Sequence, residues 1–303
     1  MKNKKIKSLI KSIRIKQWTK NLLVFSAIIF AFDFNIRTIS GTTLAFIAFC
    51  LISSAIYLIN DFFDIKSDRL HPVKKFRPIA SGELSKLEVF LSATSFTLSS
   101  LFLSSLISLN LVLIISVYFL LQIFYCLRLK KEPILDLLSI SSGFLLRALA
   151  GVIASDLSFS PWFSLSIGLL SLFLAVEKRK AELKLFIQTG VLTRNVLGRY
   201  SLELLNRYES VLTSSTFVSY SLWAAGPTLN GADTELMLLT VPFVLLGIFR
   251  YQLLSNISSI KNGSGLENKF STESPEEILL NDKGIKLTIF CWLISIILIN
   301  FAK

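Results

Sequence analysis

The 303-residue chain is poor in charged residues and has almost no histidine. Only 17% of its residues are charged and His71 is its single histidine, whereas 52% are hydrophobic. One histidine excludes a histidine-based metal cluster and a Ser-His-Asp triad. The three cysteines, Cys50, Cys126 and Cys291, lie in apolar runs without metal-ligand spacing and are interpreted as buried small residues. So little charge cannot cover a soluble surface, and the composition predicts a polytopic membrane protein.

The apolar runs predict an all-α fold with nine membrane-spanning helices. Each run is roughly long enough to cross about 30 Å of hydrocarbon. Residues 89–127 carry no charge, so this stretch is interpreted as two spans. The predicted spans are 18–36, 43–60, 87–107, 110–127, 134–154, 160–177, 210–229, 236–255 and 286–302.

Positive charge predicts the orientation. Of the 32 Lys and Arg residues, 29 lie in alternate segments between the spans and therefore on one side. The positive-inside rule places that side and the N-terminus in the cytoplasm, and the C-terminus outside the inner (plasma) membrane. Residues 1–17 form a basic cytoplasmic segment suited to anionic membrane lipid. No nucleic acid is expected as a partner, because the basic residues lie in short loops between spans.

An acidic cluster follows the second predicted span. On a helix, Tyr57, Asn60, Asp61, Asp64 and Asp68 fall within one sector of about 100°. Carboxylates packed so closely repel one another unless a cation compensates. Oxygen ligands without Cys or His favour a hard ion, Mg²⁺ before Ca²⁺, and Mg²⁺ typically joins one or two carboxylates to substrate phosphates.

Basic residues follow immediately. Lys74, Lys75 and Arg77 precede Pro78, which interrupts the helix, so we expect them on a loop that folds back over the acidic face. Acids that hold a metal, beside bases that hold phosphate, predict a diphosphate site.

The motif Asn60-Asp61-x-x-Asp64-x-x-x-Asp68, followed by Arg77-Pro78-Ile79-Ala80-Ser81-Gly82, resembles the first aspartate-rich motif of the UbiA superfamily of membrane prenyltransferases. The resemblance covers nearly the whole chain. It implies one UbiA-like transmembrane domain over 1–303, with nine helices around a central cavity. It further implies that cytoplasmic loops 61–86 and 178–207 cap this cavity and that the diphosphate is held through Mg²⁺.

A second aspartate-rich motif is missing after the sixth predicted span, where the sequence is Glu177-Lys178-Arg179-Lys180-Ala181-Glu182. With Ser141 to Arg147, this segment resembles the decaprenyl-phosphate phosphoribosyltransferase branch. That branch implies an enzyme that transfers 5-phosphoribose from 5-phosphoribosyl-1-diphosphate to a polyprenyl phosphate, for cell-wall precursors. The resemblance is also compatible with a homo-oligomer.

The predicted site combines these residues. Arg147 lies about 16 Å of helix beyond Asp136, where an arginine must face a polar cavity or a partner helix. Two roles remain for Arg147, a contact with a substrate phosphate or a structural ion pair between helices. The predicted metal ligands are Asn60, Asp61, Asp64 and Asp68. The predicted catalytic residues are Asp61, Asp64, Asp68 and Lys178. The predicted substrate contacts are Lys20, Tyr57, Lys74, Arg77, Tyr125, Lys130, Arg147, Lys178 and Arg179.

Two other functions fit parts of this pattern. A conventional UbiA prenyltransferase, which moves a polyprenyl group from its diphosphate to an aromatic acceptor, shares the first motif but needs the missing second one. A non-enzymatic lipid-phosphate carrier could use the same basic cavity. The one-sided distribution of polar residues and the lack of an internal repeat count against a carrier.

Overall fold

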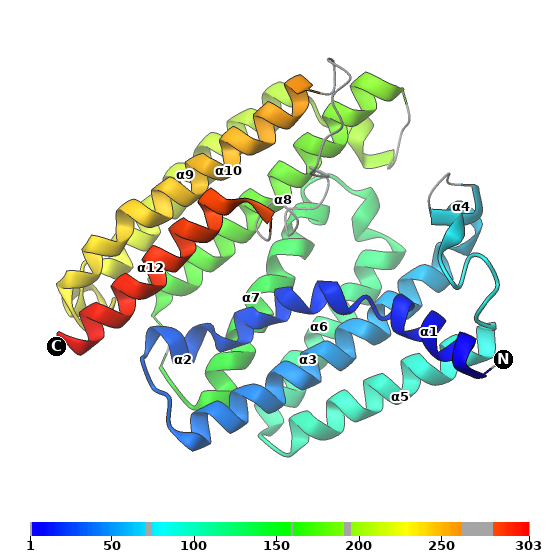
Figure 1. The fold of residues 1–303 in the computed structure, drawn as a ribbon, viewed down its shortest axis with the longest axis horizontal. Coiled ribbons are helices and arrows are strands. Elements are labelled where there is room, and N and C mark those ends of the chain that lie inside the picture. The colour runs from blue at the N-terminus through cyan, green and yellow to red at the C-terminus, as the bar shows by residue number, and fades with distance from the viewer. Residues whose placement is uncertain (1, 71–73, 159, 191–194, 262–280, 303) are drawn as a thin grey trace. The chain divides into compact units, whose positions relative to one another are not determined.

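The structure is a computed structural model that describes residues 2–70, 74–158, 160–190, 195–261 and 281–302. Every regular element in these ranges is a helix (Figure 1), as the all-α prediction requires. Both predicted cap loops fall partly outside them, at 71–73 and at 191–194.

Seven helical segments in the described ranges are long and apolar enough to cross a membrane. They are Ile36–Phe63, Lys86–Ser105, Leu109–Leu127, Leu135–Ser155, Pro161–Gln188, Glu235–Asn256 and Lys283–Phe301. Each matches a predicted span, whereas the full count of nine is not confirmed.

The two remaining predicted spans have physical reasons for falling short. Residues 18–36 form the 3-10 helix η1 (Ile15–Phe25) and the short α2 (Ser26–Phe30) rather than one long α-helix. The predicted span 210–229 lies on α9 (Leu202–Ala224), which ends five residues earlier and is rich in Ser and Thr.

The chain divides into two compact units, Met1–Leu129 with Leu146–Ser158, and Lys130–Leu145 with Phe159–Lys303. Helix α7 (Leu135–Ser155) contributes to both. The other helices of the first unit, besides η1 and α2, are α1 (Lys2–Ser12), α3 (Ile36–Phe63), α4 (Ile65–Leu70), η2 (Lys74–Phe76), α5 (Lys86–Ser105), α6 (Leu109–Leu127) and η3 (Leu129–Lys131) at its boundary.

Local sequence signals start the long helices of the first unit. The Asn35 side chain accepts hydrogen bonds from the first N–H groups of α3. Ser85 and Glu88 form a reciprocal capping box at the start of α5. These caps satisfy backbone donors that would otherwise lack partners, so α3 and α5 begin at defined residues. The two helices pack against each other (Figure 1).

Glycines allow close helix contacts in the first unit. A Cβ atom at Gly151 would lie 1.9 Å from the carbonyl oxygen of Val24, and one at Gly41 would lie 2.3 Å from that of Ala154. Small residues let backbones approach closely where lipid supplies no hydrophobic force between helices. The core that surrounds these contacts includes the buried residues Phe49, Ile52, Leu111, Ile115 and Tyr118.

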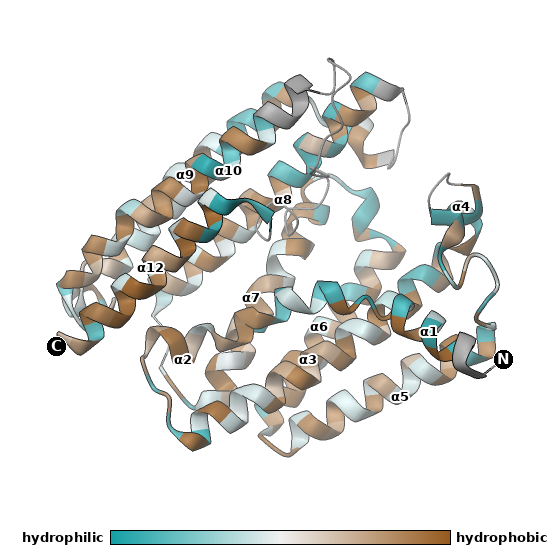
Figure 2. Ribbon diagram, viewed as in Figure 1, coloured by the Kyte–Doolittle hydropathy of each residue, from teal (hydrophilic) through white to brown (hydrophobic). Residues whose placement is uncertain are grey.

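In the second unit, α8 (Pro161–Thr189) and α9 pack along each other (Figure 1). Its core includes the buried residues Leu137, Val176, Leu183, Leu197 and Leu205. Figure 2 shows hydrophobic residues along α3 and α12, and hydrophilic residues around α4 and in the second half of α8. The remaining helices of this unit are η4 (Asn195–Arg199), η5 (Pro227–Leu229), η6 (Glu235–Thr240), α10 (Val241–Lys261) and α12 (Lys283–Phe301).

Candidate substrate site

The acidic motif lies at a break between two helices. α3 ends at Phe63, Asp64 occupies its C-cap, and α4 begins at Ile65. Helical hydrogen bonds nevertheless continue, from the Asp64 N–H to the Asn60 carbonyl at 3.0 Å and from the Asp68 N–H to the Asp64 carbonyl at 2.8 Å. The sequence predicted one uninterrupted helix for the motif, whereas the structure has a break at Asp64. The helical turns on either side of the break still stack.

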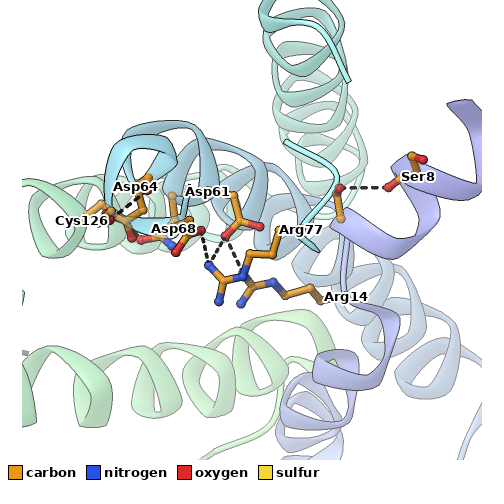
Figure 3. A network of polar contacts seen from close by, with 10 residues as sticks. Ser8, Arg14, Asp61, Asp64, Asp68, Arg77 and Cys126 are labelled. Carbon is orange, nitrogen blue, oxygen red and sulfur yellow. Dashed lines mark hydrogen bonds and ion pairs between the residues drawn. The ribbon is translucent and has the colours of Figure 1, made fainter. Parts of the chain in front are cut away.

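Two arginines bind two of the three acids (Figure 3). Nη1 of Arg77 lies 2.6 Å from Oδ2 of Asp68 and 3.2 Å from Oδ1 of Asp61. Nη2 of Arg14 lies 2.5 Å from the same Asp61 oxygen. The guanidinium of Arg14 also stands over the Tyr57 ring, 5.0 Å from its centroid. Opposite charges thus compensate the repulsion between Asp61 and Asp68.

Both arginine-bound acids are buried. Asp61 is 2% exposed and Asp68 is 4% exposed. Burial raises the pKa of the Asp68 carboxyl above its ordinary value, and the Arg77 guanidinium opposes that rise. In the described ranges, no three His, Cys, Asp or Glu side chains gather as a preformed metal cluster.

Asn60 and Asp64, the two other polar residues of the motif, are half-buried. The Cys126 thiol donates to Oδ1 of Asn60 at 3.3 Å, and Asp64 lies toward Cys126 in Figure 3. The amide oxygen of Asn60 and the carboxylate of Asp64 suit a hard cation that completes its shell with phosphate and water oxygens.

The basic loop folds back onto the motif, as its proline and its charges predict. Nε of Arg69 donates to the Ala80 carbonyl at 3.0 Å, and Ile79 and Ala80 are buried. Helix η2 precedes Arg77, whose N–H donates to the Lys74 carbonyl. This backbone arrangement carries the Arg77 side chain to the two acids.

Arg147 lies in a separate polar cluster of the first unit. It is 6% exposed. Its Nε donates to Oδ1 of Asn21 at 2.7 Å, and its Nη2 donates to the Tyr118 hydroxyl at 2.7 Å. The guanidinium also stands 4.8 Å from the Tyr118 ring centroid. The polar surroundings expected of an arginine at this depth are therefore supplied by η1 and α6.

In the second unit, Arg179 is fully buried. Its Nε donates to Oδ2 of Asp136 at 2.6 Å, and Nη1 donates to Glu182. The Tyr200 hydroxyl donates to the other Asp136 oxygen at 2.8 Å and accepts from the Ile134 N–H at 2.7 Å. Burial raises the pKa of Tyr200 above its ordinary value. This network joins α7 and α8 to the residue that follows η4.

A second buried charge cluster joins α8 to α9. Nζ of Lys180 lies 2.8 Å from Oε1 of Glu177 and also contacts Glu209. All three residues are less than 9% exposed. Between them, Arg179 and Lys180 contact four carboxylates, those of Asp136, Glu182, Glu177 and Glu209.

The other predicted substrate contacts are half-buried: Lys20, Lys74, Tyr125, Lys130 and Lys178. Their roles, and that of Arg179 toward a phosphate, stay predictions. Sequence reasoning missed Arg14, Asp136 and Glu209. Arg14 resembles ordinary topology-setting charge, whereas Glu209, a carboxylate at the edge of an apolar stretch, is a signal that could have been used.

Sequence comparisons agree on one family. The model of the UbiA prenyltransferase family matches residues 22–262. A decaprenyl-phosphate phosphoribosyltransferase of Mycolicibacterium smegmatis is 36% identical over 95% of this chain and 91% of its own length. The protein of that name from Corynebacterium glutamicum is 36% identical over 96% of this chain and 86% of its own. That from Mycobacterium tuberculosis is 31% identical, covering 96% and 93%.

Solved structures agree on the fold. A UbiA homolog from Archaeoglobus fulgidus bound to DMAPP and Mg²⁺ superposes with a TM-score of 0.69 at 17% identity, over 96% of this chain and 98% of that one. An apo UbiA homolog from Aeropyrum pernix has a TM-score of 0.64 at 13% identity, over 91% and 96%. At such identities the likeness concerns the fold alone.

Proposed function

Because the chain belongs to the UbiA prenyltransferase family, we propose that it transfers 5-phosphoribose from 5-phosphoribosyl-1-diphosphate to a polyprenyl phosphate of the decaprenyl type. In this reaction the bond between C1 of the ribose and the diphosphate oxygen breaks, and the diphosphate leaves with the electron pair. A phosphate oxygen of the polyprenyl phosphate forms the new bond to C1. The near full-length identity to three phosphoribosyltransferases carries this proposal.

The geometry of the acidic motif supports an anionic donor. Arg14 and Arg77 neutralise Asp61 and Asp68, so the motif does not confront the donor with three uncompensated carboxylates. We assign Arg77 to the diphosphate, and we keep Lys74 and Lys178 as predicted contacts for the remaining phosphate charge of the donor. Charges of this kind stabilise negative charge as it develops on the leaving group.

The oxygen donors of Asn60 and Asp64 fit Mg²⁺, and UbiA homologs have been solved with Mg²⁺ bound. We assign the ion to these two residues, with Asp61 and Asp68 in support through the arginines that they hold. Mg²⁺ would supply Lewis-acid neutralisation of the diphosphate oxygens. The acceptor phosphate is already ionised, so the chain needs no strong general base, in keeping with its single histidine.

The membrane arrangement extends the same proposal. The seven apolar segments, with η1–α2 and α9 as the two remaining members, would give nine membrane helices in a single domain that spans the inner membrane. The N-terminus and the polar loops would face the cytoplasm, where 29 of the 32 basic residues gather. The polyprenyl chain would then lie among apolar helices, and the water-soluble donor would enter from the cytoplasm.

The test uses purified protein in detergent with Mg²⁺, decaprenyl phosphate and donor radiolabelled in the ribose. We expect label in the lipid phase that disappears with EDTA and in Asp64→Asn. Glu203→Gln, which neutralises an exposed carboxylate paired with Arg207, is the matched control and should retain activity. Prenyl transfer from a polyprenyl diphosphate to an aromatic acid, without ribose transfer, would instead establish a conventional UbiA prenyltransferase.

A further inference from the structure

The N-terminal segment 5–14 binds the first polar loop along one line of contacts. Four of its residues, spaced three apart, contact that loop, the start of α5 or the acidic motif. The contacts are Lys5 Nζ to Glu88 Oε1 at 2.6 Å, Ser8 Oγ to Glu83 Oε2 at 2.5 Å, Lys11 Nζ to the Phe76 carbonyl at 3.4 Å, and Arg14 Nη2 to Asp61 Oδ1 at 2.5 Å. Residues three apart share a face of a helix, so one face of α1 accounts for this line up to its end at Ser12.

The same face is buried as well as bonded. Ser8 is 5% exposed and Ser12 is 2% exposed, and Leu9 packs against the core cluster of α3, α5 and the loop residue Ile79. The opposite face leaves Ile6 and Lys7 exposed. A basic tail that served only to attract lipid headgroups would not need such a packed, hydrogen-bonded side. We call residues 5–14 the N-terminal strap.

Arg14 ends the strap in a strained conformation. Its φ of 53° and ψ of 57° are left-handed, which is unfavourable for a residue with a side chain. Such strain persists only where the surroundings over-determine the conformation. Here the Asp61 carboxylate holds the guanidinium (Figure 3), which also stands over the Tyr57 ring. The chain therefore accepts local strain in order to bring this particular side chain to the acidic motif.

The charge arithmetic gives Arg14 a role. Asp61 and Asp68 balance Arg14 and Arg77, which leaves the four-residue cluster neutral. Without Arg14 the cluster carries one net negative charge, and of the two arginines that contact Asp61 Oδ1 Arg77 alone is left. Arg77 would then be drawn further onto the carboxylates and away from an incoming diphosphate.

We propose that the strap is part of the donor site and that Arg14 is a positioning residue for it. By satisfying Asp61, Arg14 leaves Arg77 poised to bind the diphosphate group of the donor. This inference rests on the proposed function, because it takes the donor to be a diphosphate.

The first test separates substrate affinity from folding. In Arg14→Gln we expect the KM for 5-phosphoribosyl-1-diphosphate to rise about tenfold while kcat changes little, since a buried charge pair has lost one partner. Arg14→Lys keeps the charge but loses the planar guanidinium and its stacking on Tyr57. Its donor KM should therefore lie between those of the wild type and Arg14→Gln. The double variant Asp61→Asn with Arg14→Gln should raise the donor KM by less than the product of the factors for the two single variants. Both substitutions break the same ion pair, so their effects are not independent.

A second variant keeps the test independent of any folding defect in Arg14→Gln. Lys5→Gln with Ser8→Ala loosens the strap but leaves Arg14 and Asp61 intact, and should raise the donor KM in the same direction. Lys16→Gln removes an exposed basic side chain just outside the strap and is the matched control. An unchanged KM in Arg14→Gln, or an equal rise in the control, would overturn the proposal.

A binding measurement distinguishes failure of this inference from failure of the proposed function. Calorimetric titration of the whole protein with inorganic diphosphate and Mg²⁺ requires no turnover. If the wild type transfers no ribose but Arg14→Gln still weakens diphosphate binding about tenfold, the proposed reaction is refuted and the proposed role of the strap is supported. If the wild type transfers ribose and Arg14→Gln leaves both the donor KM and the diphosphate affinity unchanged, the proposed role of the strap is refuted and the proposed reaction is supported.

Discussion

Nη1 of Arg77 lies 2.6 Å from Oδ2 of Asp68, nine residues earlier in the chain. The bond ties the loop after α4 to the last acid of the motif. Asp68 is therefore bound to an arginine, as Asp61 is, whereas Oδ1 of Asn60 accepts from the Cys126 thiol. We propose that the motif divides into residues that hold arginines, Asp61 and Asp68, and residues that hold a metal ion, Asn60 and Asp64.

This division predicts different Mg²⁺ responses. Asp64→Asn should abolish transfer or greatly raise the Mg²⁺ concentration for half-maximal activity, because an ionised ligand is lost. Asp68→Asn should raise the donor KM and leave the Mg²⁺ activation curve nearly unchanged, because Arg77 loses the carboxylate that fixes the orientation of its guanidinium. The measurement is transfer rate against Mg²⁺ at several donor concentrations, with Glu203→Gln as the control. Identical Mg²⁺ curves for the two acid variants would refute the division.

Arg147 is predicted to act first on stability. Arg147→Met removes the bonds to Asn21 and Tyr118, and the polar groups left buried should cost about 1–3 kcal/mol. Tyr118→Phe removes one of these bonds and should cost about 0.5–1.5 kcal/mol. Thermal unfolding in detergent measures both. If Arg147→Met unfolds like the wild type but loses donor or acceptor affinity, Arg147 contacts a substrate phosphate instead, which is the role that the resemblance implies.

Much of the fold and part of the site follow from short-range sequence signals. Hydropathy located seven segments because each is one regular helix that is long and apolar enough to cross a membrane. The meeting of Asp61 and Asp68 at Arg77 could also be predicted. Two helical turns separate the acids, and Pro78 turns the basic loop back toward them.

The remainder depends on contacts between distant segments. Arg14 looks like any basic residue that sets topology, and only tertiary structure brings it to Asp61, 47 positions later. The pairing of Arg179 with Asp136 joins two helices across 43 positions and leaves no periodic pattern. The 3-10 geometry of η1 is likewise invisible to hydropathy, which measures composition and not helix type.

Tyr200 is predicted to stabilise the start of α7. Tyr200→Phe leaves the Ile134 N–H and one Asp136 oxygen without this hydroxyl and should cost about 1–3 kcal/mol. The pKa of Tyr200 is raised in the fold above its ordinary value of 10.0. The stabilisation that the Tyr200 hydroxyl gives to the fold is therefore complete below pH 10.0. It is lost as the pH rises through the pKa of Tyr200 in the folded protein. Unfolding midpoints measured up to alkaline pH should converge for Tyr200→Phe and wild type, and a constant difference would contradict this account.

Lys180 is predicted to be essential for folding through the two acids that it pairs. Lys180→Met leaves Glu177 and Glu209 buried together without their common cation, a loss of about 3–5 kcal/mol. Adding Glu177→Gln and Glu209→Gln removes both uncompensated charges, and the triple variant should recover most of the stability because neutral side chains are cheaper to bury. Folded yield and the thermal midpoint in detergent measure both variants. If the triple variant is no more stable than Lys180→Met, the cluster stabilises α8 against α9 through its specific bonds and not through charge balance.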